Sequence, residues 1–440
     1  MKPAVTSARA TAAEEGAHLR LSVLVSNLAL IAARVASMGL GFLTWLLAAR
    51  LFAPADVGIA SALVAAMMLC VQLGLLGIGS AVVALLPSHR AAQGHMVDVG
   101  ATVVVLCVVG VTLGYFVLAG TLLKELSLVV APGYAVLFLA MTVFGTLNTY
   151  YDYVSLALRR GDQVLVRNIA FGIVTLTVLA ISASLLGGAP GSLLILLAWA
   201  SAGVAACAIA GVQVARALSR RPAVRLDRLL TSRLVGVGWP NWLLTLTERA
   251  PALGMPVMIA TMLGPTTNAF WYAAWMMAWV VLIIPISIGQ SVYAELSRDP
   301  STAKSSVLHG LRSSLVIGVP AALVLAVAAE LALMLLGARY AAESAPALRV
   351  LVVSVVPVTV IQAYYAVSRA RGALTEAIGV GALGGAATVA AALTAGQISG
   401  LVAMAAAWVV AQNILAILAG VRLWSMFRTT AAGPDPGPRR

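Results

Sequence analysis

Charged side chains are scarce in this chain of 440 residues, since only 10% are Asp, Glu, Lys or Arg, against about 25% in an average soluble domain. Apolar residues make up 61%. So few charges cannot cover the surface of a globule this large, which excludes a soluble enzyme and a disordered chain. The charges are also unequal, with 28 Lys and Arg against 15 Asp and Glu. A nucleic-acid-binding protein must therefore be considered until these charges are located.

Cysteine and the common metal and nucleotide motifs are also nearly missing. Cys70, Cys107 and Cys207 lie inside apolar runs and form no CxxC pair, so neither a disulfide framework nor a zinc site is expected. The four histidines lack metal-ligand spacing, and no Gly-Lys pair provides a phosphate-binding lysine. The sequence predicts no metal and no cofactor.

One glycine motif has a structural interpretation. Residues 379–384 match GxGxxG, but they lie inside an apolar run rather than after a strand, so they are not a dinucleotide site. Glycines four residues apart allow close packing of membrane helices. This packing is predicted for Gly381 and Gly385, and likewise for Gly110 and Gly114.

Long apolar runs dominate what is present. A membrane-spanning helix needs about 20 mainly apolar residues, and twelve segments qualify. Only helices and closed barrels span lipid, and these runs are about twice as long as a barrel strand. The sequence therefore predicts an all-α polytopic membrane protein with about twelve transmembrane helices, at residues 22–49, 57–86, 97–118, 129–157, 164–186, 192–215, 234–262, 267–293, 308–329, 348–367, 374–395 and 400–424.

The connections between these segments alternate in charge. One side carries 22 Lys and Arg residues and the other carries four. The positive-inside rule places the basic side and both termini in the cytoplasm. The net charge thus reflects topology, and the expected partner is membrane lipid rather than nucleic acid.

The longest basic connection divides the chain. The predicted organisation is a cytoplasmic tail, an N-terminal six-helix bundle, a basic cytoplasmic linker, a C-terminal six-helix bundle and a disordered tail, at residues 1–20, 21–215, 216–233, 234–428 and 429–440. Pro54 and Pro265 occupy similar turns in the two bundles, which indicates parallel repeats. Two such bundles facing each other are expected to enclose a V-shaped central cleft.

Several segments resemble bacterial polysaccharide and O-antigen flippases of the multidrug/oligosaccharidyl-lipid/polysaccharide (MOP) exporter superfamily. Residues 48–58 read Ala-Ala-Arg-Leu-Phe-Ala-Pro-Ala-Asp-Val-Gly, and a glycine-rich stretch follows at 73–79. Each motif is loose, and the order and spacing of the set are more specific. The further matching segments are 263–265, 272–274, 283–285, 294–297, 336–340 and 348–351.

This resemblance implies a transporter of the bacterial cytoplasmic membrane rather than an enzyme. Its relatives move undecaprenyl-pyrophosphate-linked oligosaccharide from the inner to the outer leaflet by alternating access. A polysaccharide polymerase, glycosyltransferases and a coupling ion are the further partners that it suggests.

Three charges lie deep inside predicted spans, where charge is costly and indicates a functional site. Arg34 lies about 20 Å into its helix at 1.5 Å per residue, and Arg249 lies at a similar depth beside Glu248. Guanidinium groups suit phosphate oxygens, so both arginines are predicted to bind the substrate pyrophosphate, with Glu248 gating the cleft. Neighbouring polar positions complete the predicted substrate site: Asn27, Asn241 and Thr245.

A structural alternative is equally open for these charges. Glu248 and Arg249 point about 100° apart on a helix, so Glu248 would pair with Arg34 and the three would form a fixed salt-bridge network between the halves.

Two other functions remain open. A multidrug and toxin extrusion-type antiporter would need deep carboxylates in the N-terminal half, where only Asp152 occurs, near the inner edge of its span. A membrane-embedded polysaccharide polymerase or acyltransferase would need a catalytic cluster that the sequence does not display. The polar and aromatic residues around Asp152 suggest either an aromatic belt or a sugar-binding rim: Asn148, Tyr150, Tyr151 and Tyr153.

Overall fold

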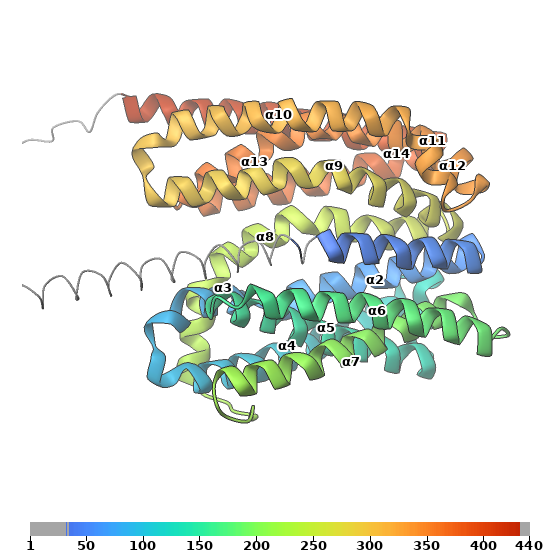
Figure 1. The fold of residues 1–440 in the computed structure, drawn as a ribbon. Coiled ribbons are helices and arrows are strands. Elements are labelled where there is room, and N and C mark those ends of the chain that lie inside the picture. The colour runs from blue at the N-terminus through green and yellow to red at the C-terminus, as the bar shows by residue number, and fades with distance from the viewer. Residues whose placement is uncertain (1–31, 33–34, 432–440) are drawn as a thin grey trace, which may run out of the picture. The chain divides into compact units, whose positions relative to one another are not determined.

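The computed structural model describes Ala32 and residues 35–431 of the chain. The two predicted terminal tails, together with Asn27 and Arg34, lie largely or wholly outside these residues. Within them all regular structure is helical (Figure 1). Nine of the described helices are long and apolar enough to cross a membrane. The chain is therefore a multi-pass membrane protein, as the apolar runs predict.

Each of the twelve predicted segments coincides with one helix or a broken helix. The first is described over Val35–Leu51. The long helix α14 (Leu374–Ala431) contains the last two segments, because Gly400 interrupts it with a φ of 78° and a ψ of −164°. The remaining described α-helices are α2 (Pro54–Gly74), α3 (Ile78–Leu85), α4 (Gln93–Thr121), α5 (Pro132–Ala157), α6 (Gly161–Leu185), α7 (Gly191–Ala217), α8 (Arg228–Met262), α9 (Pro265–Arg298), α10 (Ala303–Val327), α11 (Ala329–Met334), α12 (Ala338–Leu351) and α13 (Val355–Ala370).

The two proline turns that suggested a repeat begin corresponding helices. Pro54 is the first residue of α2 and Pro265 is the first residue of α9, where the fixed φ of proline suits a helix start and its missing N–H costs nothing. The two helices then differ. α9 continues through Pro285 to Arg298, whereas the expected single helix over 57–86 is broken after Gly74.

The break between α2 and α3 requires glycine. Gly77 has a φ of 78°, a left-handed conformation that side chains disfavour. Its backbone also packs against the backbone of Gly238, so a Cβ atom on either residue would overlap the other. The turn and the start of α8 are thus held together by two glycines.

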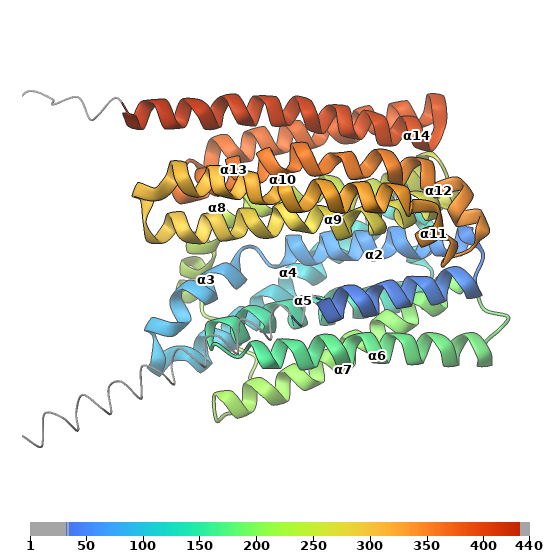
Figure 2. The same ribbon diagram turned by 45° about the horizontal axis from the view of Figure 1, so that its top comes forward.

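The described chain divides into two compact units. The first contains residues up to Leu51, Cys70–Leu122 and Ser127–Trp242, and the second contains Phe52–Leu69, Leu123–Leu126 and Leu243 onward. In the first unit α5, α6 and α7 pack together (Figure 2). In the second unit α9, α10 and α13 pack together, and α13 also contacts α14.

Within the second unit, a buried asparagine of α9 forms hydrogen bonds with the first part of α2. The Asn268 side chain of α9 is fully buried and donates from Nδ2 to the Gly58 carbonyl (2.8 Å) and to the Ser61 hydroxyl (3.1 Å). Gly58 has no room for a Cβ atom because the Pro265 carbonyl lies against it. This contact lies within the second unit, and the division of the chain into two repeats at 216–233 stays a prediction.

Candidate functional site

The predicted C-terminal site lies in the middle of α8, and its two charges have different surroundings. Glu248 is largely buried, with 14% of its side chain exposed, whereas Arg249 is exposed. Within the described part of the chain, Arg249 has no ion pair or hydrogen bond. It stands about 20 Å before the end of α8 at Met262, so a free guanidinium at this depth requires a water-filled cavity or a ligand.

Glu248 is paired with Arg369, which lies just beyond the end of the predicted span 348–367. Its Oε2 accepts a hydrogen bond from Arg369 Nη2 at 2.8 Å, and the Arg369 side chain is only 16% exposed. Arg369 lies in the last turn of α13. The expected partner, Arg34, lies outside the described residues. The second carboxylate oxygen of Glu248 is buried without a hydrogen-bond partner in the described structure, so it retains the capacity to accept a donor.

A glycine of α14 allows three helices to meet beside this pair. A Cβ atom on Gly381 would lie 2.8 Å from both the Thr247 hydroxyl and the Tyr365 hydroxyl. Tyr365 is buried one turn before Arg369 on α13. The ion pair therefore sits in a tightly packed corner of α8, α13 and α14.

The predicted glycine packing is correct for one of the two pairs. Gly385 lies against Pro251 of α8, and Gly381 has the contacts given above. Gly110 and Gly114 have open space where a Cβ atom would be, so the prediction is wrong for them. Spacing alone does not reveal which face of a helix meets a neighbour.

Asn241 and Thr245 lie on α8 before Glu248, at positions that share its face. Both are partly buried, and both have interaction partners. Asn27 lies outside the described residues, like Arg34. Asn241, Thr245 and Glu248 thus share one face of α8, and Glu248 pairs with Arg369, while a substrate-binding role for these residues stays a prediction.

The first unit contains a buried charge cluster that sequence reasoning missed. Arg167 of α6 is completely buried and donates to the Asp152 carboxylate (2.5 Å) and the Ser155 hydroxyl (3.1 Å) of α5, and to the Gln213 carbonyl oxygen of α7. Arg167 falls near the start of the predicted span 164–186 and is one of the 22 basic residues counted for the cytoplasmic side, but α6 begins at Gly161, so Arg167 lies almost two turns inside the helix. It joins three helices of one unit.

The tyrosines before this cluster form no aromatic belt. Tyr150 is completely buried and donates its hydroxyl hydrogen to the Val97 carbonyl (3.0 Å). Tyr151 is only 6% exposed. Both rings are therefore packing elements of the first unit, and neither the lipid-facing nor the sugar-facing interpretation applies.

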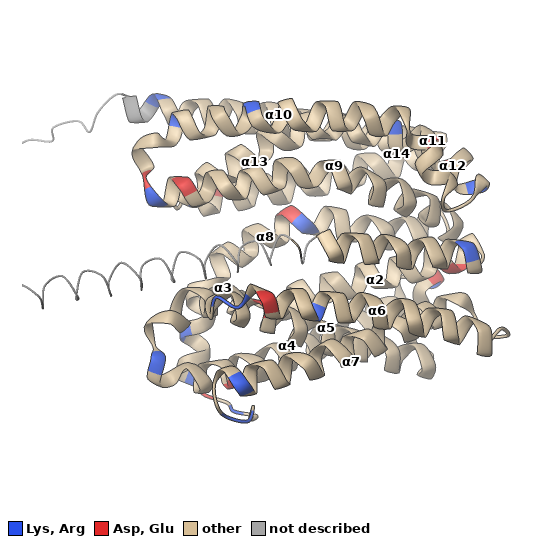
Figure 3. Cartoon of the chain, in the orientation of Figure 1, with Lys and Arg blue, Asp and Glu red and all other residues tan. Residues whose placement is uncertain are grey.

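Most charged residues lie toward the helix ends (Figure 3). Three exceptions have distinct environments: Arg249 is exposed and has no ion pair among the described residues, Glu248 is in an ion pair, and Arg167 is fully enclosed. In the described residues, no group of three or more His, Cys, Asp or Glu side chains is arranged to hold a metal ion.

Comparison with known sequences identifies a family. The family model described as "Polysaccharide biosynthesis protein" matches residues 24–298. No curated protein matches the chain.

Solved structures agree on the fold. An inward-facing multidrug resistance MATE family transporter of the MOP superfamily is 14% identical, with a TM-score of 0.71 over 91% of this chain and 98% of that one. A MOP superfamily transporter from Pyrococcus furiosus, described as having a binding pocket of reversed polarity, is 13% identical, with a TM-score of 0.67 over 94% and 96%. At these identities the similarity establishes a MOP transporter fold.

Proposed function

Because this chain belongs to the polysaccharide biosynthesis protein family and has the fold of MOP transporters, we propose that it is a flippase for polyprenyl-pyrophosphate-linked oligosaccharide. It moves this lipid from the inner to the outer leaflet by alternating access and performs no covalent chemistry. Its location is the bacterial cytoplasmic membrane, with both termini in the cytoplasm. Glycosyltransferases supply its substrate and a polymerase consumes it.

The observation that carries this proposal is the guanidinium of Arg249 in the middle of α8, which has no ion pair or hydrogen bond among the described residues. A fixed positive charge at this depth is costly unless an anion or water meets it. Pyrophosphate offers several acceptor oxygens that match the guanidinium fork. Arg34 is proposed to add a second cation, and Asn27, Asn241 and Thr245 to contact the sugar or phosphate groups.

Glu248 has a different role in this proposal. It is held by Arg369 within the same unit, so it serves to keep Arg369 neutralised and α8 attached to α13. Its second carboxylate oxygen, which has no hydrogen-bond partner among the described residues, offers an acceptor for a sugar hydroxyl.

The test is polymer export in a host strain that depends on this chain. We expect Arg249→Ala to abolish most export at normal protein level, and Arg249→Lys to retain part of it, because lysine keeps the charge but loses the bidentate geometry. Arg298→Ala serves as the matched control, since Arg298 is an exposed arginine at the end of α9. Full export by Arg249→Ala would refute the binding role.

A multidrug antiporter fits the fold equally well, since the structural relatives include multidrug transporters. An antiporter needs a carboxylate that is free to exchange a cation, and in the first unit Asp152 is bound to Arg167. Drug sensitivity of a deletion strain with normal polysaccharide would favour the antiporter. Loss of surface polysaccharide with unchanged drug sensitivity would favour the flippase.

A further inference from the structure

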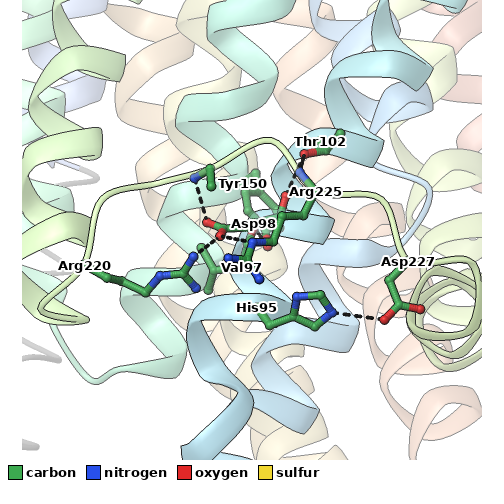
Figure 4. A network of polar contacts seen from close by, with 9 residues as sticks. His95, Val97, Asp98, Thr102, Tyr150, Arg220, Arg225 and Asp227 are labelled. Atoms are coloured by element: carbon green, nitrogen blue, oxygen red, sulfur yellow. Dashed lines mark hydrogen bonds and ion pairs between the residues drawn. The ribbon is translucent and has the colours of Figure 1, made fainter.

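The connection between α7 and α8 is fixed to the side of α4 by a buried carboxylate. Asp98 lies in α4 and is only 4% exposed. One of its oxygens pairs with the Arg220 guanidinium and lies 3.6 Å from Arg225 Nε, and the other accepts the Ala223 N–H at 3.2 Å. Figure 4 shows these groups converging on Asp98. A carboxylate this buried needs such partners, so the connection has a defined position.

Two further contacts extend this attachment. The backbone N–H of Arg225 donates to the Thr102 hydroxyl at 3.1 Å. Thr102 lies one turn further along α4 than Asp98. On the other side, His95 Nε2 lies 3.0 Å from an Asp227 oxygen (Figure 4). The second Asp227 oxygen accepts the backbone N–H of Leu230 at the start of α8. The connection thus follows the first turns of α4 instead of projecting away from them.

These contacts set its depth. α4 has 29 residues and is about 44 Å long at 1.5 Å per residue, whereas the hydrocarbon layer is about 30 Å thick. A centred α4 extends about 7 Å beyond the hydrocarbon at each end. Asp98 is five residues from the start of α4, about 8 Å along it. The attachment therefore lies at the boundary between headgroups and hydrocarbon.

The same face of α4 meets lipid. Thr102 lies within about 60° of Leu106, Leu113 and Val117 around the helix at 100° per residue. All three are exposed apolar side chains in a membrane-spanning helix. The connection lies at the end of this lipid-facing stripe.

The connection itself exposes large apolar and basic side chains. Val224 is 88% exposed and Leu229 is 84% exposed, with Leu226 also exposed between them. Arg221 and Arg228 are exposed and have no ion pair within the described residues. Alternating apolar and basic residues at this depth match a bilayer interface, where apolar groups enter the acyl boundary and guanidinium groups reach phosphates.

We propose that residues 221–229, the lipid strap, bind anionic phospholipid at the membrane surface. Arg221 and Arg228 contact the headgroups, and Val224, Leu226 and Leu229 insert beside them. Asp98 holds the strap against α4 and neutralises part of the charge of Arg220 and Arg225. The strap thereby anchors the connection between the repeats to the leaflet, independently of what the protein transports.

The depth of the strap is tested with the full chain reconstituted in phosphatidylglycerol–phosphatidylcholine vesicles. An environment-sensitive label is placed on Val224→Cys in a Cys107→Ala, Cys207→Ala background, since Cys70 is buried. The control label is on Ser301→Cys, in the exposed turn after α9. We expect the emission of the label at position 224 to be shifted to the blue, and its fluorescence to be quenched by a shallow spin-labelled lipid but not by iodide. The fluorescence of the label at position 301 should be quenched by iodide but not by the spin-labelled lipid. Equal iodide quenching at both positions would overturn insertion.

Charge selectivity is tested by counting phosphatidylglycerol molecules retained by the purified full chain in native mass spectrometry. Each arginine near an anionic surface contributes about fivefold in affinity, so Arg221→Gln with Arg228→Gln should weaken retention about 25-fold and leave phosphatidylcholine unchanged. The matched control, Arg298→Gln with Arg312→Gln, removes two exposed arginines elsewhere and should retain wild-type binding. An equal loss of phosphatidylglycerol retention in both double variants would show nonspecific attraction and overturn the proposed lipid strap. Unchanged retention in both double variants would overturn it as well. Melting temperatures of all variants identify any loss through misfolding.

Discussion

At the scale of single residues, the pair of Glu248 and Arg369 separates a packing role from a transport role. Each side chain is mostly buried, so removing either partner leaves an unpaired charge. We expect Glu248→Gln alone to cost about 2–4 kcal/mol, below the range for a fully buried pair because both side chains retain some exposure. Thermal unfolding of the solubilised chain measures this cost.

The double variant of this pair is the informative control. Glu248→Gln with Arg369→Gln removes both charges and should recover most of the lost stability. If export stays low in this stable double variant, Glu248 or Arg369 contributes to transport beyond holding α8. Recovery of export together with stability would restrict the pair to a structural role.

Asp227 gives a second prediction at this scale, concerning pH. The hydrogen bond with the His95 ring, and then the bond from the Leu230 N–H, lower the pKa of Asp227. The charged carboxylate is thus favoured in the folded chain, so its stabilisation is complete above the ordinary Asp pKa of about 4 and is lost as the pH falls through the lowered value.

The variant Asp227→Asn retains a capping side chain but not the charge. Its melting temperature should lie below that of the wild type at pH 6 and approach it as the pH falls below about 4. His95→Gln removes the first cause of the shift and should flatten this pH dependence. A difference that stays constant from pH 6 to pH 3 would contradict the assignment.

At the scale of helices, two glycines provide a matched comparison. A Cβ atom on Gly385 would lie 2.5 Å from Pro251 Cγ, in a ring that cannot rotate away, whereas Gly110 has open space. Gly385→Ala should therefore cost about 1–3 kcal/mol through overpacking. Gly110→Ala should gain about 0.5–1 kcal/mol, because alanine loses less backbone freedom in a helix. Thermal unfolding compares them, and equal effects would show that α14 does not meet α8 at this point.

The helices themselves were predictable, and the polar contacts between them were not. Apolar length located the spans, and proline located the starts of α2 and α9. Arg167 was missed because a charge close to a span end has the same local signature whether it faces solvent or a neighbouring helix. Its partners, Ser155 of α5 and Gln213 of α7, are 12 and 46 residues away. A single sequence does not encode such pairings in any local pattern.

For Asp98 the missing information was of the same kind. Its partners Arg220 and Ala223 are 122 and 125 residues away in the sequence. The linker could be identified from its basic composition, but not that a carboxylate on α4 holds it. Arg249 is the converse case: its depth alone predicted an exceptional environment, and the structure leaves it unpaired among the described residues.

For the whole molecule, the distribution of charge predicts the orientation that the flippase proposal requires. The connections that together carry 22 basic residues should remain in the cytoplasm, and the connections that together carry four should be translocated to the other side of the membrane. Gly188, between α6 and α7, and Ser301, after α9, are exposed positions that the predicted orientation places on opposite sides of the membrane. In a Cys107→Ala, Cys207→Ala background, we expect Gly188→Cys to react with an impermeant maleimide in intact cells and Ser301→Cys to react only after permeabilisation. The reverse labelling would invert the orientation and place the lipid strap in the outer leaflet, whereas labelling of both positions in intact cells would contradict an odd number of spans between them.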